Sequence, residues 1–161
     1  MKDEYLIAIL FVVVVLLILF VFRKKAPLKY KRVQNLFTPS ERKFYHLLQE
    51  VLPPKTVLFA KVRAADVILP ESAKDRSRWR SAFNRVACKH FDYVVCNEKL
   101  EILCAIELDD ASHNKEERRE RDIFLNWACK SAGVPLLRIP LQKEYDKKGL
   151  QRTIERACKR Y

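Results

Sequence analysis

Four side chains that could carry out chemistry lie close together in the segment CAIELDDASHNKEERRERD, residues 104–122. Glu107, Asp109, Asp110 and His113 fall within seven positions, where an apolar run changes to a charged one. Carboxylate oxygens are ligands for hard divalent cations such as Mg²⁺, and histidine exchanges a proton near neutral pH. The segment therefore predicts either a metal or acid–base site, or a plain loop that leads to a helix cap.

A further carboxylate is expected to meet this cluster across a β-hairpin. The string FDYVVCNEKLEILCAIEL contains two β-rich runs that flank a short turn, a pattern typical of a hairpin. Asp92 opens the first strand and Glu107 closes the second, and in an antiparallel pair these two ends lie side by side. Asp92, Glu107 and the Leu108 carbonyl could therefore hold a divalent ion, although acidic residues at strand ends are more often solvated.

The elements that must position these residues form one α/β domain. Apolar residues at helical spacing predict a helix that is capped by Thr38 or Ser40 and ends at the prolines 53–54, and further helices over 115–132 and 147–159. A strand region is expected over 56–69, a helix around residues 77–90, and a short buried strand in VPLLRIP. The order is helix, strand, helix, two strands, helix, strand and helix, which is typical of an α/β fold.

The N-terminal segment is predicted to cross a membrane. Residues 5–22 are 18 residues without a charge, and as a helix they would span about 27 Å, close to the hydrocarbon core of a bilayer. Bases follow at once, without a small-residue cleavage site, so we expect an uncleaved anchor; the alternative is a buried core helix. The positive-inside rule places the C-terminal part in the cytoplasm and the N-terminus outside.

The sequence therefore predicts a single-pass protein of the inner (plasma) membrane with three parts. These are a transmembrane anchor over 1–22, a basic linker over 23–35 and a folded domain over 36–161. The five cysteines are an odd number, widely scattered and without a CxxC motif, which favours reduced cytosolic thiols.

Positive charge permits a nucleic-acid partner. The formal net charge is +12, of which the bases beside the anchor are explained by topology and anionic lipid. Arg78 and Arg80 flank Trp79, and arginines interleaved with an aromatic residue predict a surface for phosphates and stacked bases. The alternative for this stretch is a solvated helix face.

The order of these motifs resembles that of a known nuclease superfamily. Asp92, then Glu107-Leu108-Asp109 at the end of the next strand, then a helix and a short strand, resembles the PD-(D/E)XK nucleases, and Glu41 fits the acidic residue that many members carry in the first helix. The strings FDYVV, IELDDASH and ERRERDIFLNWACKSAGVPLLRI are similar to the bacterial family catalogued as domain of unknown function 2726. The chain is more distantly similar to the very-short-patch-repair endonucleases. The resemblance covers about residues 36–157.

This resemblance implies a fold, a cofactor and a role for each matching residue. The fold would be a restriction-endonuclease-like three-layer core with a mixed four-stranded sheet. Asp92 and Glu107, with Asp109 as a further ligand, would bind Mg²⁺ or Mn²⁺, which polarises the scissile phosphate and activates a water. The expected catalytic residues are Glu41, Asp92, Glu107, Asp109, His113 and Asp122. The expected substrate-binding residues are Lys115, Arg118, Arg138, Arg78 and Arg80.

One position departs from the superfamily pattern. The superfamily has a lysine two positions after the second acid, and this chain has Asp109 there. A carboxylate repels a phosphate oxygen, so the missing positive charge would have to come from His113, Lys115 or Arg118. Asp122 either belongs to the site or only pairs with Arg118 one turn away, and Arg138 reaches either the acidic cluster or only the surface.

The resemblance and the apolar N-terminal segment together imply a membrane-anchored, metal-dependent enzyme that hydrolyses phosphodiester bonds in nucleic acid, with DNA as the expected substrate and the lipid bilayer as a second partner. The alternative is a catalytically inactive nuclease-fold module that binds nucleic acid or a protein partner at the membrane. The aspartate at position 109 is the feature that divides the two hypotheses.

Overall fold

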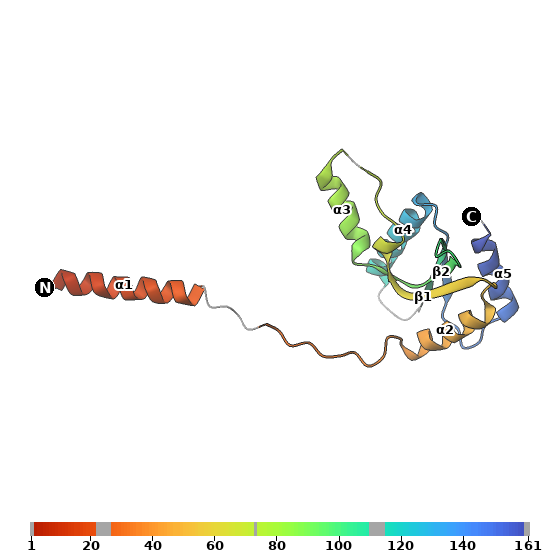
Figure 1. Ribbon diagram of the computed structural model, residues 1–161, viewed down its shortest axis with the longest axis horizontal. Coiled ribbons are helices and arrows are strands. Elements are labelled where there is room, and N and C mark those ends of the chain that lie inside the picture. The colour runs from red at the N-terminus through yellow and green to blue at the C-terminus, as the bar shows by residue number, and fades with distance from the viewer. Residues whose placement is uncertain (1, 22–26, 73, 110–114, 160–161) are drawn as a thin grey trace. The chain divides into compact units, whose positions relative to one another are not determined.

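The computed structural model describes residues 2–21, 27–72, 74–109 and 115–159. The chain divides into two compact units, residues 1–36 and residues 37–161. The first unit contains one helix, α1 (Lys2–Val21), which is apolar along most of its length. Figure 1 labels the elements of both units.

The prediction of a transmembrane anchor is wrong. Within the described part of the chain, no helix combines the length and the apolar character needed to cross a membrane. The predicted single-pass topology and inner-membrane localisation are therefore wrong as well.

The second unit is built on a mixed four-stranded sheet, which agrees with the sheet that the family resemblance implies. The strands are β1 (Thr56–Arg63), β2 (His90–Asn97), β3 (Ile102–Asp109) and β4 (Leu136–Pro140), in the spatial order β1-β2-β3-β4. The pairs β1–β2 and β2–β3 are antiparallel, and β3–β4 is parallel. Because the neighbouring strands β3 and β4 are parallel, the chain between them must cross over the sheet, and this connection contains the 17-residue helix α4 (Lys115–Ser131).

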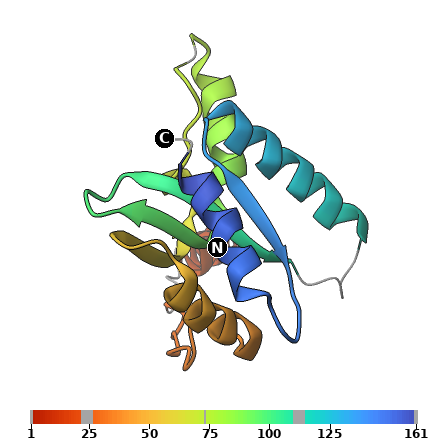
Figure 2. The same ribbon diagram turned by 90° about the vertical axis from the view of Figure 1, so that its right-hand side faces the viewer.

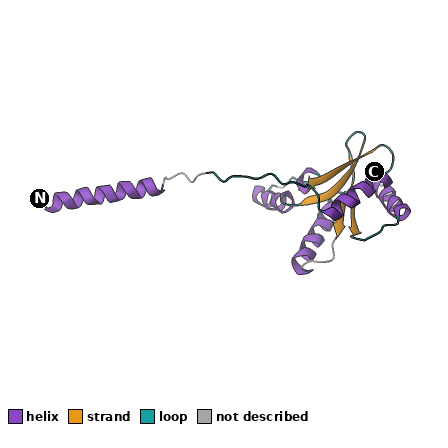
Figure 3. Ribbon diagram, turned by 90° about the horizontal axis from the view of Figure 1, so that it is seen from below, coloured by secondary structure: helices purple, strands orange, loops and turns teal. Residues whose placement is uncertain are grey.

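Helices cover both faces of this sheet and create two separate cores. On one face lie α2 (Pro39–Val51) and α5 (Lys147–Cys158), and on the other lie α3 (Arg76–Ala87), α4 and a short 3₁₀ helix, η1 (Ala64–Asp66). Figures 2 and 3 show the helices around the sheet. The first core buries Phe44, Leu48, Tyr93, Ile106 and Ile154, and the second buries Phe91, Val94, Ala105, Leu125 and Cys129. Each fully buried aliphatic or aromatic side chain contributes about 1.5–3 kcal/mol of transfer free energy.

The start of α2 is fixed by the capping signal that the sequence contains. The Thr38 hydroxyl accepts a hydrogen bond from the backbone N–H of Glu41 at 3.3 Å, and the Glu41 carboxylate accepts one from the Thr38 N–H at 2.9 Å. This reciprocal pair is a capping box, with Pro39 at the first helical position. The cap therefore also holds Glu41, a predicted site residue, at the helix N-terminus.

Candidate functional site

A lysine that sequence analysis did not select lies at the centre of the predicted acidic site. The Lys61 ammonium lies 2.7 Å from a Glu41 carboxylate oxygen and 3.0 Å from an Asp92 oxygen. These three residues come from β1, α2 and β2, and their side chains are 28%, 19% and 19% exposed, respectively. We call this cluster the lysine group. It combines two predicted acids with a positive charge that is absent from position 109.

Lys61 has an unusual backbone conformation within β1. The β1–β2 ladder pairs Ala60 with Tyr93 and Val62 with Phe91, and Lys61 between these pairs has a φ of 54°. This left-handed conformation is unfavourable for a residue with a Cβ atom. Strained backbone of this kind costs about 1–3 kcal/mol and clusters at functional sites. Because a regular strand would avoid this cost, we expect Lys61 to have a role beyond strand pairing.

The partners of Lys61 are themselves held in place by the backbone and the core. The second Asp92 oxygen accepts a hydrogen bond from the Leu108 N–H at 3.0 Å, which connects β2 to the end of β3. The buried Tyr93 hydroxyl donates to the Glu41 carbonyl at 2.6 Å and so fastens the first turn of α2 to the sheet. The lysine group is therefore a rigid junction between three elements, which is what a positioned functional site requires.

The electrostatic environment keeps Glu41 and Lys61 charged near neutral pH. Burial by itself would raise the pKa of Glu41, but the hydrogen bond from Lys61 and the Thr38 cap outweigh it, and the pKa lies below its usual value of 4.5. Burial would likewise lower the pKa of Lys61, but the hydrogen bonds to Glu41 and Asp92 outweigh it and raise the pKa above 10.5. Lys61 is thus a cation that donates hydrogen bonds.

These shifts predict a plateau of stability between acid and alkaline pH. Glu41, with its lowered pKa, contributes stability above pH 4.5 that is lost as the pH falls through its folded-state pKa. Lys61, with its raised pKa, contributes stability below pH 10.5 that is lost as the pH rises through its folded-state pKa. Urea unfolding of the full chain on the plateau and beyond both limits measures this. In Lys61→Met, the loss of unfolding free energy at acid pH and the loss at alkaline pH should both be smaller than in the parent. An identical pH profile in the parent and the variant would contradict the role of the Lys61 ion pairs in stability.

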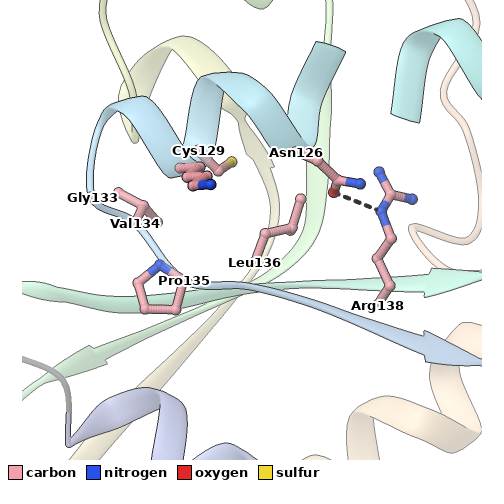
Figure 4. Close-up of a pocket in the computed structure, with 8 residues that line it drawn as sticks. Asn126, Cys129, Gly133, Val134, Pro135, Leu136 and Arg138 are labelled. Atoms are coloured by element: carbon pink, nitrogen blue, oxygen red, sulfur yellow. Dashed lines mark hydrogen bonds between the residues drawn. The ribbon is translucent and has the colours of Figure 1, made fainter. Parts of the chain in front are cut away.

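A second charged group lies at the end of β3 and β4. Arg138 Nη1 lies 3.2 Å from an Asp109 oxygen and 3.1 Å from an Asp122 oxygen, and its Nε donates to the Asn126 side chain at 3.0 Å. Figure 4 shows Arg138 reaching from β4 toward Asn126 on α4, beside an open cavity of about 760 Å³. We call this cluster the arginine group. Arg138 therefore reaches the acidic segment, and Asp122 is its ion-pair partner.

Glu107 lies between the two groups and is the buried carboxylate of the site. It is 5% exposed, and its register partner on β4 is Arg138. On the opposite side of β3, its neighbour Ile106 pairs with Tyr93 on β2, which is the residue next to Asp92. Its charge also affects α4: burial, and then the Glu107 carboxylate, raise the pKa of the Cys129 thiol to about 12, while Arg138 acts in the opposite direction. Cys129 is accordingly a neutral thiol and not a nucleophile.

The predicted metal centre is not present as a group of ligands. Among the described residues, no cluster of three or more His, Cys, Asp or Glu side chains is arranged to hold a metal ion. Both Asp92 oxygens are engaged, by Lys61 and by the Leu108 N–H, and Asp109 pairs with Arg138. The protein's own cations thus occupy the places that we expected an ion to fill, and the residues do not fit the predicted three-carboxylate site.

The remaining predicted residues lie elsewhere or outside the described part. His113 lies outside the described residues, and so do the side chains of Lys115 and Arg118. Arg78 and Arg80 are exposed on α3, on the face of the sheet opposite α2. Lys61 could have been selected from one signal only, a single charged residue inside the apolar strand sequence TVLFAKV.

The chain matches the model of a known protein family. The family described as "Protein of unknown function (DUF2726)" matches residues 33–157, most of the chain and nearly all of the second unit. No curated protein and no solved structure matches the chain.

Proposed function

Because the chain belongs to the DUF2726 family, whose description names no activity, we propose a function from the site itself: the hydrolysis of phosphodiester bonds in nucleic acid. The observation that carries this proposal is Lys61, a cation fixed between Glu41 and Asp92 beside the strand that ends in Glu107. The nuclease-like pattern of two acids and a lysine is then complete, with the lysine supplied by β1 instead of position 109.

Lys61 is suited to stabilise the charge that develops on a phosphate. Its raised pKa keeps the ammonium protonated at neutral pH, so it serves as a hydrogen-bond donor and not as a general base. A preorganised donor aimed at a developing negative charge is among the largest contributions to catalysis. Glu41 and Asp92 act as positioning residues. Their hydrogen bonds fix the place of the ammonium, which would otherwise move with the flexible lysine side chain.

The carboxylates of the two groups outnumber their cations. Within the described residues, the lysine group places two carboxylates, those of Glu41 and Asp92, around one ammonium, and the arginine group places Asp109 and Asp122 around one guanidinium. A phosphate is repelled by such an excess of negative charge, so additional positive charge from solution should favour its approach. The family resemblance implies Mg²⁺ or Mn²⁺ as the cofactor. We therefore include these ions in the assay and assign no ligands to them.

A catalytically inactive module is the second candidate, and the pairing of Asp109 favours it. The Asp109–Arg138–Asp122 bridges connect β3, β4 and α4, which is sufficient to explain these residues as structural. In this alternative the lysine group would likewise only fasten α2 to the sheet, and nucleic acid would bind without being cut.

Cleavage of DNA by the purified full-length chain distinguishes the two candidates. Supercoiled plasmid and a labelled single strand should be converted to nicked or shortened products with Mg²⁺ or Mn²⁺, and more slowly with EDTA, because the excess of carboxylates then faces the phosphate uncompensated. The time course on agarose and denaturing gels is the measurement. Retarded but intact nucleic acid under all three conditions would contradict the hydrolase and support the inactive module.

A further inference from the structure

We propose that the apolar cavity between α3, α4 and the segment after η1 binds a single unstacked base of a nucleic-acid strand. This inference rests on the proposed function, because it concerns the same class of partner. The cavity has a volume of about 280 Å³ and is lined by residues from three elements, among them Leu69, Ala82, Val86, Phe124 and Trp127. It lies on the α3/α4 face of the sheet, whose core is separate from the one beneath α2.

The size and the lining of the cavity suit one planar ring system. Pockets for drug-sized molecules hold about 300–1,000 Å³, so this one is at the small end. Trp127 is 64% exposed although it lines the cavity, and its neighbour Phe124 lies one turn away with ring centroids 6.3 Å apart. An aromatic side chain that is exposed beside an apolar hollow offers a stacking surface of the kind that single-stranded nucleic acids use.

Trp79, the aromatic residue that the sequence pattern suggests for base stacking, is not free to do so. Its ring stacks on Phe83 at 5.2 Å with an interplanar angle of 9°, and its Nε1 donates to the Pro70 carbonyl at 3.2 Å. Trp79 therefore fastens α3 to the segment after η1, one wall of the cavity. The stacking role moves to Trp127, which the sequence pattern did not select.

Cations surround the cavity in positions where they can meet phosphates. The Arg85 guanidinium lies 4.0 Å from the centroid of the Phe124 ring, and the Lys89 ammonium lies 5.4 Å from it. Arg78 precedes the lining residue Ala82 by one helical turn and is exposed. None of these three cations takes part in an ion pair within the described residues. Charge and stacking surface thus occur together, as a base-bearing anionic strand requires.

A carboxylate at the cavity, that of Glu71, favours bases that can donate a hydrogen bond. Glu71 is among the lining residues, and an ionised carboxylate only accepts hydrogen bonds. A base with an exocyclic amino group, such as cytosine, can donate to it. Cytosine is therefore the base to use as a probe.

The test compares a strand that has bases with one that lacks them at the same charge. The full-length chain is titrated in EDTA into a labelled strand of about twelve deoxycytidines, and into the same strand with abasic sites, by fluorescence anisotropy. The abasic strand should bind about tenfold more weakly, as the loss of one stacked base predicts. Trp127→Ala should weaken binding of the deoxycytidine strand to the abasic level and leave the abasic strand unchanged. Ile123→Ala, an equally exposed apolar residue one turn away, is the matched control and should change neither.

The contribution of the cations is measured separately from stacking. Arg85→Gln should weaken both strands by a similar factor and lower the slope of log affinity against log salt by about 0.7. Equal binding of the two strands, or a loss of both on Trp127→Ala, would overturn the proposal. If the two strands bind equally well and an acidic amphipathic peptide displaces the deoxycytidine strand, the cavity belongs to a protein partner. This result would also overturn the proposal.

Failure of this inference is distinguishable from failure of the proposed function. Plasmid cleavage by the parent chain depends on the lysine group and does not require the two labelled strands to bind with different affinity. Cleavage without discrimination between the two strands would overturn the base pocket alone, whereas discrimination without cleavage would contradict the hydrolase alone.

Discussion

Lys61→Met is expected to lower the rate of plasmid cleavage on the order of 10³-fold, because it removes a preorganised donor to the developing phosphate charge. Methionine is unbranched and of similar length, so the shape of the side chain changes little while the charge between Glu41 and Asp92 is lost. The rate is measured with the full-length chain under single-turnover conditions. Lys61→Arg, which retains a cation with a different geometry, should keep part of the activity.

A loss of stability must not be mistaken for a loss of catalysis. Removing Lys61 leaves two half-buried carboxylates facing each other, which we expect to cost about 2 kcal/mol, between the values for exposed and buried ion pairs. Urea unfolding measures this cost, and cleavage is then compared at a temperature where the variant is folded. Lys99→Met, in the exposed hairpin turn, is the matched control and should cleave at the parental rate. Equal rates for Lys61→Met and Lys99→Met would contradict a role for Lys61 in the reaction.

Local signals in the sequence were sufficient to predict most elements of the second unit. The capping residue Thr38, the hairpin of β2 and β3, and the closure of α4 near Gly133 each depend on neighbouring residues. The placement of Asp92 and Glu107 on adjacent antiparallel strands follows from the same local pattern, because a hairpin fixes which strand ends meet. The roles of the two acids in chemistry stay predictions.

Lys61 could not be selected from local signals because its partners come from distant parts of the chain. The continuous β1–β2 register on both sides of Lys61 places it beside Asp92, 31 positions away, and its left-handed φ is not visible in the neighbouring residues. Among the described residues, the expected group of metal ligands is absent for a related reason. We expected crowded carboxylates to need an ion, whereas Lys61 and Arg138 reduce the repulsion from distant points of the chain. Long-range ion pairs of this kind leave no spacing pattern in the sequence.

The most direct test of the central claim is the rate of plasmid cleavage by Asp92→Asn relative to the parent chain. The substitution removes, at nearly constant volume, the negative charge that lies 3.0 Å from the Lys61 ammonium, on a side chain that also accepts a hydrogen bond from the Leu108 N–H. We expect cleavage by the parent and a loss of about 10²-fold in the variant, because the Lys61 ammonium is then no longer held in position. Equal cleavage by both proteins, with the variant folded, would contradict this claim.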